Sequence, residues 1–256
     1  SYSMFQVDKK KQSDAPEKAE KPATGMENVD ALLAVDDLEL EVGYGLIALV
    51  DKAQGGDLLD KIRSIRRQFA LDMGIVVPPI HIRDNLKLGP NQYAFLLRGI
   101  EVARGEIIPD QYLAMESGIV EQKIEGIPTK EPAFGLPALW VSGDKREKAQ
   151  MFGYTVVDPS TVLGTHISEL LKTYMHEVIG RQEVQSLLNK VAEKNPKLVD
   201  ELVPGLLPLG TVQKVIQNLL RERVSIRNMV TILEVLADYA PTTKNTDILT
   251  EYVRQA

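Results

Sequence analysis

The sequence lacks cysteine altogether, and this absence excludes several kinds of chemistry. Without a thiol, the chain can form no disulfide and offers neither a thiolate nucleophile nor a thiolate metal ligand. No stretch approaches the roughly 18 consecutive apolar residues of a membrane-spanning helix, and the N-terminus has no apolar core typical of a signal peptide. The net charge is −6, whereas most nucleic-acid-binding domains carry an excess of basic residues.

Phenylalanine is scarce, with five in 256 residues, and one of them stands in an unusual place. The stretch "KEPAFGLPALWVSG" places Phe134 between Pro132 and Pro137. The two prolines exclude a helix interior and favour turn or extended backbone, which usually lies on the surface. Two interpretations follow: Phe134 plugs the core from a loop, or it is exposed and binds a partner.

Sequence motifs that would indicate catalysis or a cofactor are missing. There is no phosphate loop, dinucleotide fingerprint or Gly-x-Ser-x-Gly elbow. His81 lies in an apolar stretch, which is typical of a structural histidine. His166 and His176 are ten residues apart, unlike the i, i+4 pair of a metal-binding helix. We therefore predict no metal and no cofactor; catalysis by carboxylates far apart in sequence remains an alternative.

The C-terminal third contains a helix pair that could be mistaken for a DNA reader. "TVQKVIQNLLRERVSIRNMVTILEVL" predicts two helices around a turn that carries Arg221, Arg223 and Arg227. Residues 181–256, however, hold ten Lys and Arg against nine Asp and Glu. Without a basic field, we expect any DNA binding to be weak and to be lost as salt rises.

The first 36 residues are expected to form a flexible linker. Between Val7 and Met26 there is no large apolar residue, so this part cannot bury enough surface to offset its ordering entropy. Met26, Val29, Leu32 and Leu33 then recur at helical spacing. They predict a short amphipathic helix that is marginal on its own.

A mixed α/β region is predicted up to about residue 179, and a helical region after it. Asp57 and Gly74 bound one strong helix, and Asp158 caps another that begins at Pro159. Later helices are expected to be capped by Thr211 and Ser225, and the last runs from about Thr246 to the end. Alternating or apolar stretches predict strands at the following places: from Leu38, 75–83, a hairpin over 92–108, 112–116, 138–143 and 154–158.

Several segments, in fixed order, resemble one known family. They are "LEVGYGLIALVD", "LLDKIRSIRRQFALDMG", "VPPIHIRDN", "EPAFGLPALWV", "TVVDPSTVLGTHISELLK", "GRQEVQSLLNKV" and "LVPGLLPLGTVQKVIQNLLRERVSIRNMVTILE". The ordered set, from about residue 37 to 256, resembles the cytoplasmic domain of the flagellar and injectisome export-gate (FHIPEP) family.

The resemblance implies a discontinuous thioredoxin-like subdomain at 37–109 and 159–178. It implies an inserted βαββ subdomain, similar to RNA-recognition folds, at 110–158, and a helical subdomain at 179–256. The insertion lacks the aromatic strand signature that stacks bases, so we expect no RNA binding. The last predicted helix reaches Ala256 without a cap, and the family has a fourth subdomain, so we expect the natural chain to continue.

The resemblance further implies a non-enzymatic function in protein export. The family protein has a membrane half, and its cytoplasmic domains form a nonameric ring that docks flagellar export chaperones with their cargo and contacts other export-apparatus proteins. On this basis we expect an inner-membrane protein's cytoplasmic domain with no small-molecule substrate. An α/β enzyme with a carboxylate or metal site is the alternative.

The resemblance also implies where partners bind. The family's chaperone dimple is an acid–Pro–Ala–Phe turn that faces a threonine. The corresponding residues are Glu131 to Phe134 and Thr165, with Glu131 where most relatives carry aspartate. Leu136, Val157 and Val162 are expected to line the same hollow. The amphipathic linker residues Met26, Val29, Leu32 and Leu33 are expected to contact a neighbouring subunit.

Overall fold

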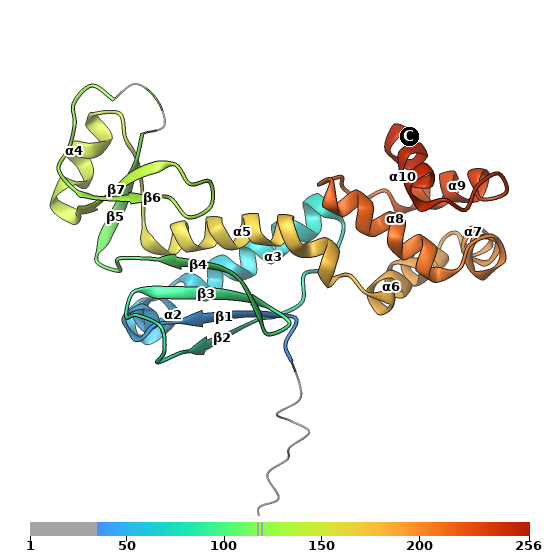
Figure 1. Cartoon of the computed structure of the whole chain (residues 1–256), viewed down its shortest axis with the longest axis horizontal. Helices are drawn as coiled ribbons and strands as arrows, with labels where there is room; N and C mark the ends of the chain where they lie inside the picture. Colours follow the sequence, from blue (N-terminus) through green and yellow to red (C-terminus); the bar gives the residue numbers. More distant parts are fainter. Residues whose placement is uncertain (1–34, 117, 119) are drawn as a thin grey trace, which may run out of the picture. The chain divides into compact units, whose positions relative to one another are not determined.

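The computed structural model describes residues 35–116, 118 and 120–256. Val35–Ala256 form one compact unit. The expected linker helix, with Met26, Val29, Leu32 and Leu33, lies outside the described residues. The unit contains two four-stranded sheets and a series of helices, which confirms the expected mixed α/β region followed by a helical one (Figure 1).

The first sheet has the strand order β2-β1-β3-β4. Its strands are β1 (Leu38–Val42), β2 (Ile80–Asp84), β3 (Gln92–Leu97) and β4 (Ile100–Glu106). β1 pairs in parallel with β2 and antiparallel with β3, and β3 and β4 form the expected hairpin. The second strand was expected to start at residue 75. It starts at Ile80 instead, because Pro78 and Pro79 lack the N–H groups that a sheet ladder needs.

The connection between β1 and β2 contains the long helix α3 (Leu58–Met73). Its apolar side chains Leu58, Ile62 and Phe69 share one buried face, as their spacing predicts. Gly74 ends the helix at φ +80°, a left-handed conformation that glycine adopts without strain. The shorter elements of this connection are η1 (Tyr44–Leu46), α2 (Ile47–Val50) and η2 (Lys52–Gln54).

The second sheet has the strand order β6-β7-β5-β8. Its strands are β5 (Gln111–Met115), β6 (Ile127–Lys130), β7 (Pro137–Ser142) and β8 (Thr155–Val157), and η3 (Gly143–Lys145) and α4 (Arg146–Met151) precede β8. The order along the chain is therefore β-β-β-α-β, and the βαββ order expected for 110–158 is wrong. The unexpected strand is β6, "IPTK". It is a short edge strand containing Pro128, so it has no alternating apolar pattern to reveal it.

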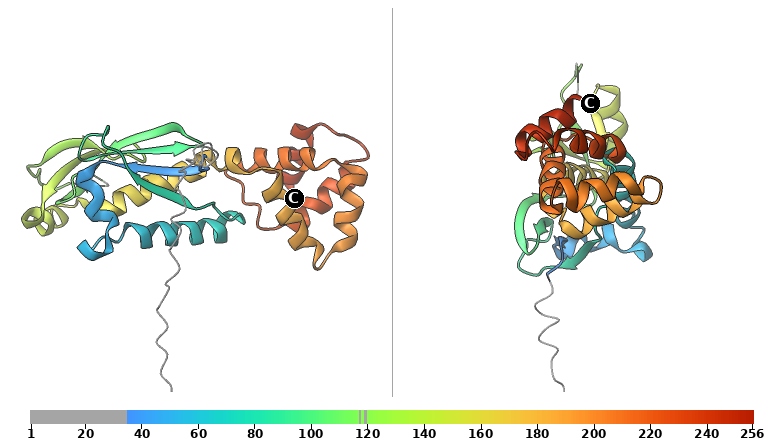
Figure 2. Two further views of the ribbon diagram at one scale, coloured as in Figure 1. Left: turned by 90° about the horizontal axis from the view of Figure 1, so that it is seen from below. Right: turned by 90° about the vertical axis from the view of Figure 1, so that its right-hand side faces the viewer.

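Helix α5 (Pro159–Val178) follows the second sheet and returns to the first. Asp158 caps it as predicted, since its carboxylate accepts a 2.9 Å hydrogen bond from the backbone N–H of Thr161. Its side chains Leu163, Ile167, Leu170 and Val178 are buried, whereas Tyr174 is only partly buried. α3 and α5 lie together on the same face of the first sheet (Figure 2).

The helical region begins at Arg181. It comprises α6 (Arg181–Ala192), α7 (Pro196–Asp200), η4 (Glu201–Leu206), α8 (Leu209–Arg221), α9 (Met229–Tyr239) and α10 (Thr246–Gln255). The last helix starts where it was predicted. The caps expected at Thr211 and Ser225 are wrong: α8 starts at Leu209 after Pro208, and Asn228 caps α9. The Ser225 hydroxyl donates instead to the Asp72 carbonyl at the end of α3.

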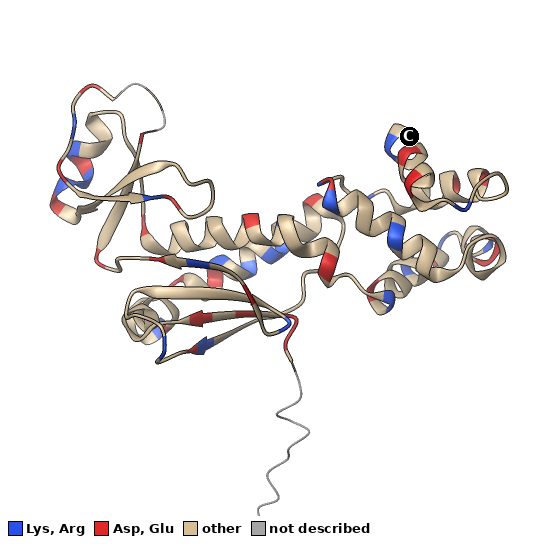
Figure 3. Ribbon diagram, in the orientation of Figure 1, with Lys and Arg blue, Asp and Glu red and all other residues tan. Residues whose placement is uncertain are grey.

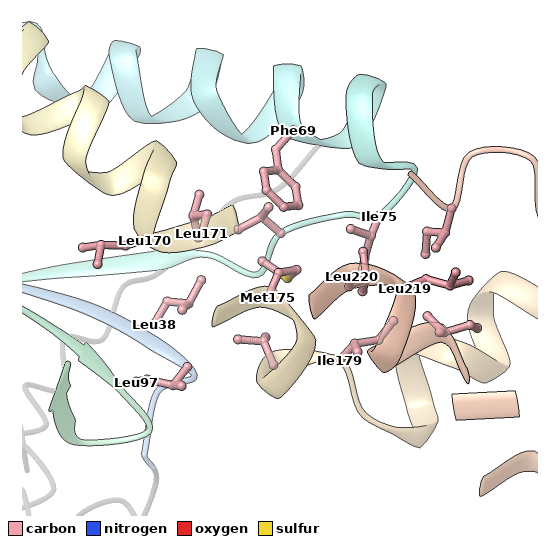
Figure 4. Packing of buried hydrophobic residues seen from close by; sticks show 14 of the residues in the cluster. Leu38, Phe69, Ile75, Leu97, Leu170, Leu171, Met175, Ile179, Leu219 and Leu220 are labelled. Atoms are coloured by element: carbon pink, nitrogen blue, oxygen red, sulfur yellow. The ribbon is translucent and has the colours of Figure 1, made fainter. Parts of the chain in front are cut away.

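One apolar core joins the first sheet to the helical region. Figure 4 shows Leu38 and Leu97 of the sheet on one side of this core, and Leu219 and Leu220 of α8 on another. Met175 of α5 is buried among these groups. Because apolar burial contributes roughly 25 cal/mol per Å², this shared core couples the stability of the two regions.

Candidate functional site

The stretch with the isolated phenylalanine forms the turn between β6 and β7. The backbone N–H of Glu131 donates to the Leu136 carbonyl at 2.8 Å, which closes the turn at its base. The N–H of Gly135 donates back to the Glu131 carbonyl, also at 2.8 Å. Gly135 has φ +70°, a conformation that other residues adopt only with strain. The local sequence therefore specifies a tight, closed loop.

The Glu131 side chain holds this loop from inside. Glu131 is only 3% exposed. Its Oε1 accepts a 2.8 Å hydrogen bond from the backbone N–H of Ala133, and its Oε2 accepts a 2.7 Å bond from that of Phe134. A buried carboxylate is tolerated when donors replace its hydration, and hydrogen bonds to a charged acceptor are the stronger kind. Glu131 thus determines the position of the Phe134 backbone.

Phe134 is 60% exposed. Leu136, two residues further on, is exposed as well. Of the two interpretations of this phenylalanine, the core plug is therefore wrong. An exposed aromatic on a rigid turn loses little conformational entropy when a partner covers it.

A cavity of about 200 Å³ opens beside the turn. It is lined by Met115, Glu131, Phe134, Leu136, Val157, Val162 and Thr165. The six residues expected for the dimple thus lie together, although they come from the β6–β7 turn, β8 and α5. We call these seven residues the dimple. Met115 was not predicted. It ends β5 and is paired with Thr155 of β8, and this pairing is not visible in the sequence.

Helix α5 supplies the other wall of the dimple. Val162 is buried, whereas Thr165 is half-buried and its hydroxyl donates a 2.9 Å hydrogen bond to the Thr161 carbonyl one turn earlier. This internal bond satisfies the hydroxyl and leaves the Thr165 methyl group as apolar surface. A groove of about 570 Å³ between α3 and α5 is also lined by Thr165, so this residue borders both the groove and the dimple.

Ion pairs fix α5 against α3 at this end. Lys61 Nζ lies 2.7 Å from Asp158 Oδ1 and 2.9 Å from Asp57 Oδ2. Partial burial acts to raise the pKa of Asp158, but hydrogen bonds from Lys61 and Thr161 outweigh it, so the pKa lies below its ordinary value. Charged residues of both signs lie along α3 (Figure 3). Among the seven dimple residues, Glu131 is the charged one.

The histidines do not form a shared site. His81, on the edge strand β2, has its Nδ1 2.6 Å from Oδ1 of Asp36. His166 is buried, and its Nδ1 lies 2.7 Å from the Tyr93 hydroxyl. His176 lies 3.7 Å from Glu177. Among residues 35–116, 118 and 120–256, no three His, Asp or Glu side chains are grouped so that they could hold a metal ion.

The predicted helix pair differs from a DNA reader in its geometry. Seven residues, 222–228, separate α8 from α9, so the turn is not tight. Arg223 at this turn lies 3.2 Å from Glu169 of α5 and is engaged within the molecule. In the described part of the chain, no helix is long and apolar enough to cross a membrane.

Comparison with known proteins gives a consistent result. The chain matches the FHIPEP family over residues 2–256. The flagellar biosynthesis protein FlhA of Bacillus subtilis (strain 168) is 54% identical over 230 residues, which make up 90% of this chain and 34% of that protein. FlhA of Escherichia coli (strain K12) is 48% identical over 221 residues, or 86% of this chain and 32% of that protein. The chain thus spans about a third of the length of these curated relatives.

Solved structures show the same fold. A chain of the Chlamydia pneumoniae CdsV and CdsO protein complex is similar, with a TM-score of 0.75 and 31% identity over 86% of this chain and 65% of that one. The nonameric EPEC SctV-C, solved by cryo-EM, has a TM-score of 0.65 and 25% identity, with the same coverage of 86% and 65%. On this match over nearly its whole length, and on these similarities in sequence and fold, the chain belongs to the FHIPEP family.

Proposed function

We propose that this chain is a non-enzymatic docking platform of a flagellar protein export gate, and that the dimple binds export chaperones with their cargo. The observation that carries the proposal is the exposed Phe134, held on a turn by the buried Glu131 beside an apolar cavity. An aromatic anchor next to a hollow is typical of protein–protein interfaces.

The dimensions of the dimple favour a protein side chain over a small molecule. Its volume of about 200 Å³ lies below the roughly 300–1,000 Å³ of typical small-molecule sites. Its charged group, the Glu131 carboxylate, is already engaged by two backbone N–H groups. The remaining lining offers mainly apolar contact, which suits one apolar side chain of a chaperone. We infer that the partner contributes such a residue.

Self-assembly is the second part of the proposal. The similar SctV-C chain is nonameric, and we propose that copies of this chain form a comparable ring. Met26, Val29, Leu32 and Leu33 would contact the neighbouring subunit. The subdomain boundaries at 37–109 with 159–178, at 110–158 and at 179–256 belong to the same proposal, with a thioredoxin-like fold for the first. So does a place on the cytoplasmic side of the inner membrane, beside other export-apparatus proteins.

The enzyme alternative has no specific observation in its favour. The large groove between α3 and α5 holds Asp57, Asp60 and Glu169, but each of these carboxylates is paired with a lysine or arginine. The pKa of each of these three carboxyls lies below its ordinary value, which makes it a weaker proton acceptor or donor at neutral pH.

The proposal is tested by titrating purified flagellar export chaperones, each with and without its cargo, into this chain in a calorimeter. We expect saturable binding by at least one chaperone–cargo pair and no heat from duplex DNA of the same concentration at physiological salt. If no chaperone binds in either form, the proposed function is wrong.

A further inference from the structure

The groove between α3 and α5 borders the dimple but has no part in the docking function as proposed so far. Its volume is about 570 Å³, and Thr165 of α5 lines both hollows. The two helices lie side by side over one face of the first sheet (Figure 2). A partner that places a side chain in the dimple therefore meets this groove as the next surface along α5.

The groove is lined by one face of each helix. On α5, the lining residues Thr161, Thr165, Ser168 and Lys172 are three or four positions apart, which places them in one row along the helix. The distance from the first to the last is about 16 Å at 1.5 Å per residue, or three helical turns. The groove is therefore an elongated channel between two helices and differs in shape from the compact dimple.

Small side chains keep this channel open. A Cβ atom at Gly164 of α5 would lie 3.3 Å from Cδ1 of Ile65, so the Ile65 side chain packs against the α5 backbone and forms an apolar floor. Ser64 of α3 and Ser168 of α5 also line the groove. Because neither helix fills the space with a large side chain here, the side chains of a third helix can pack between them.

The charged side chains of the groove are already paired. Asp57 lies 2.9 Å from Lys61, and Lys172 lies 2.7 Å from Glu169. Asp60 lies 3.0 Å from Lys52, outside the groove. Within the described residues, the lining thus offers no unpaired charge. A charged segment would lose hydration here without gaining a partner, so the groove suits an uncharged surface.

The backbone of the walls restricts which secondary structure can bind. The N–H and C=O groups in the interior of α3 and α5 are bonded within each helix. An extended strand needs backbone partners, and these walls provide none. A helix satisfies its own backbone groups and needs only side-chain contacts.

We propose that the α3–α5 groove binds the uncharged face of a helix of the export chaperone, next to the apolar side chain that enters the dimple. The inference rests on the proposed docking function and adds to it the chemistry of the second contact. The bound face consists of small and apolar side chains against Ile65 and Gly164, with hydroxyl or amide side chains opposite Ser64 and Ser168. Thr165 belongs to both contacts, so one partner can occupy them together.

Two substitutions test the groove without altering a dimple residue. Ser64→Trp and Ser168→Trp fill it from opposite walls, and we expect each to weaken calorimetric binding of chaperone with cargo by about tenfold or more. Ser186→Trp is the matched control, since it makes the same change at an exposed serine of α6 outside the groove. It should bind like the parent. Thermal unfolding checks that each variant is folded, and the exposed Ser64 decides the result if Ser168→Trp does not fold.

Cross-linking tests whether the bound segment is a helix. Because the chain has no cysteine, Ser64→Cys can carry a single benzophenone label. We expect cross-links to chaperone residues three or four positions apart. The inference is overturned by cross-links without this spacing, by cross-links only to a second copy of this chain, or by equal losses in Ser186→Trp. It is also overturned, with the docking function intact, if both groove variants bind like the parent while Phe134→Ala binds weakly. A parent that binds no chaperone refutes the docking function and this inference together.

Discussion

The backbone N–H of Phe134 donates a 2.7 Å hydrogen bond to Oε2 of Glu131, so an exposed aromatic and a buried acid belong to one structural unit. The acid is inside because its two oxygens find backbone donors there. The aromatic is outside because the loop that the acid closes turns its side chain away from the core. A change at the buried residue is therefore expected to act on the exposed one.

Substitutions of Glu131 test how much its two acceptor oxygens contribute to stability. Glu131→Gln keeps one acceptor oxygen, and we expect a loss of about 1–2 kcal/mol in the free energy of unfolding, since a hydrogen bond to a charged group contributes about 1.5–3 kcal/mol. Glu131→Ala, which leaves both N–H groups without the carboxylate, should cost more. Urea denaturation of the three proteins checks the order, and equal midpoints would show that the turn does not depend on Glu131.

The Asp158 cap predicts a pH dependence of stability. Because the pKa of Asp158 is lower in the folded chain than its ordinary value, the carboxylate stabilises the fold above about pH 4. That contribution is lost as the pH falls through the folded-state pKa. Asp158→Ala should cost about 1–2 kcal/mol at pH 7. Asp158→Asn, which keeps a capping oxygen, should cost less.

Thermal unfolding of these proteins at pH 7 and pH 3 distinguishes the cap from the charge. The gap between the parent and Asp158→Asn should narrow at pH 3, because the charge-dependent contribution of Asp158 is lost as the pH falls toward and through its lowered folded-state pKa. A gap of the same size at both pH values would mean that the ion pair with Lys61 contributes nothing.

Gly74 provides a test of the junction between α3 and the helical region. A Cβ atom there would lie 2.6 Å from the backbone N and Cα of Arg227, and φ is +80°. Gly55 has a similar φ of +84°, but a Cβ atom on Gly55 would meet no heavy atom within 4 Å, so Gly55→Ala measures the backbone strain alone. We expect the free energy of unfolding to fall by about 1–2 kcal/mol in Gly55→Ala, and by clearly more in Gly74→Ala. Equal losses of unfolding free energy in a denaturant titration would show that the backbone around Arg227 moves aside without a loss of stability.

How far the sequence predicted the structure depends on the range of the interactions. Helices with strong apolar periodicity and local signals, such as α3 with Gly74 and α5 with Asp158, were predicted because the information lies within a few residues. The β6 strand was not predicted because its four residues include a proline and show no alternating apolar pattern. It is defined by its pairing with β7, which lies further along the chain.

The dimple shows the same division. Six of its seven residues were predicted from a family resemblance, whereas Met115 was not predicted. Nothing in the spacing of Glu131, Val157 and Thr165 indicates that they meet. The β7–β5–β8 pairing and the return of α5 bring them together. The burial of Glu131 could not be predicted either, because a glutamate is rarely buried and its two donors are backbone groups that every sequence contains.

The linker is tested by deleting residues 1–34. This boundary leaves Asp36 in place, whose carboxylate lies 2.6 Å from His81 Nδ1 and 2.7 Å from Arg83 Nη2, so the sheet is not disturbed. We expect the thermal midpoint to stay nearly unchanged and self-association, measured by analytical ultracentrifugation, to weaken. A large fall in the thermal midpoint would instead mean that the linker stabilises its own subunit.

The most direct test of the docking account is the chaperone affinity of Phe134→Ala, measured by calorimetry against the parent. Tyr44→Ala is the matched control, because Tyr44 is an exposed aromatic (64%) outside the dimple. Truncating an interface anchor often costs about 2 kcal/mol or more, so we expect the Kd of Phe134→Ala to rise at least about tenfold. Its unfolding free energy should fall by less than the roughly 3–5 kcal/mol of a buried phenylalanine, and Tyr44→Ala should bind like the parent. A folded Phe134→Ala that binds chaperone as tightly as the parent would contradict the account.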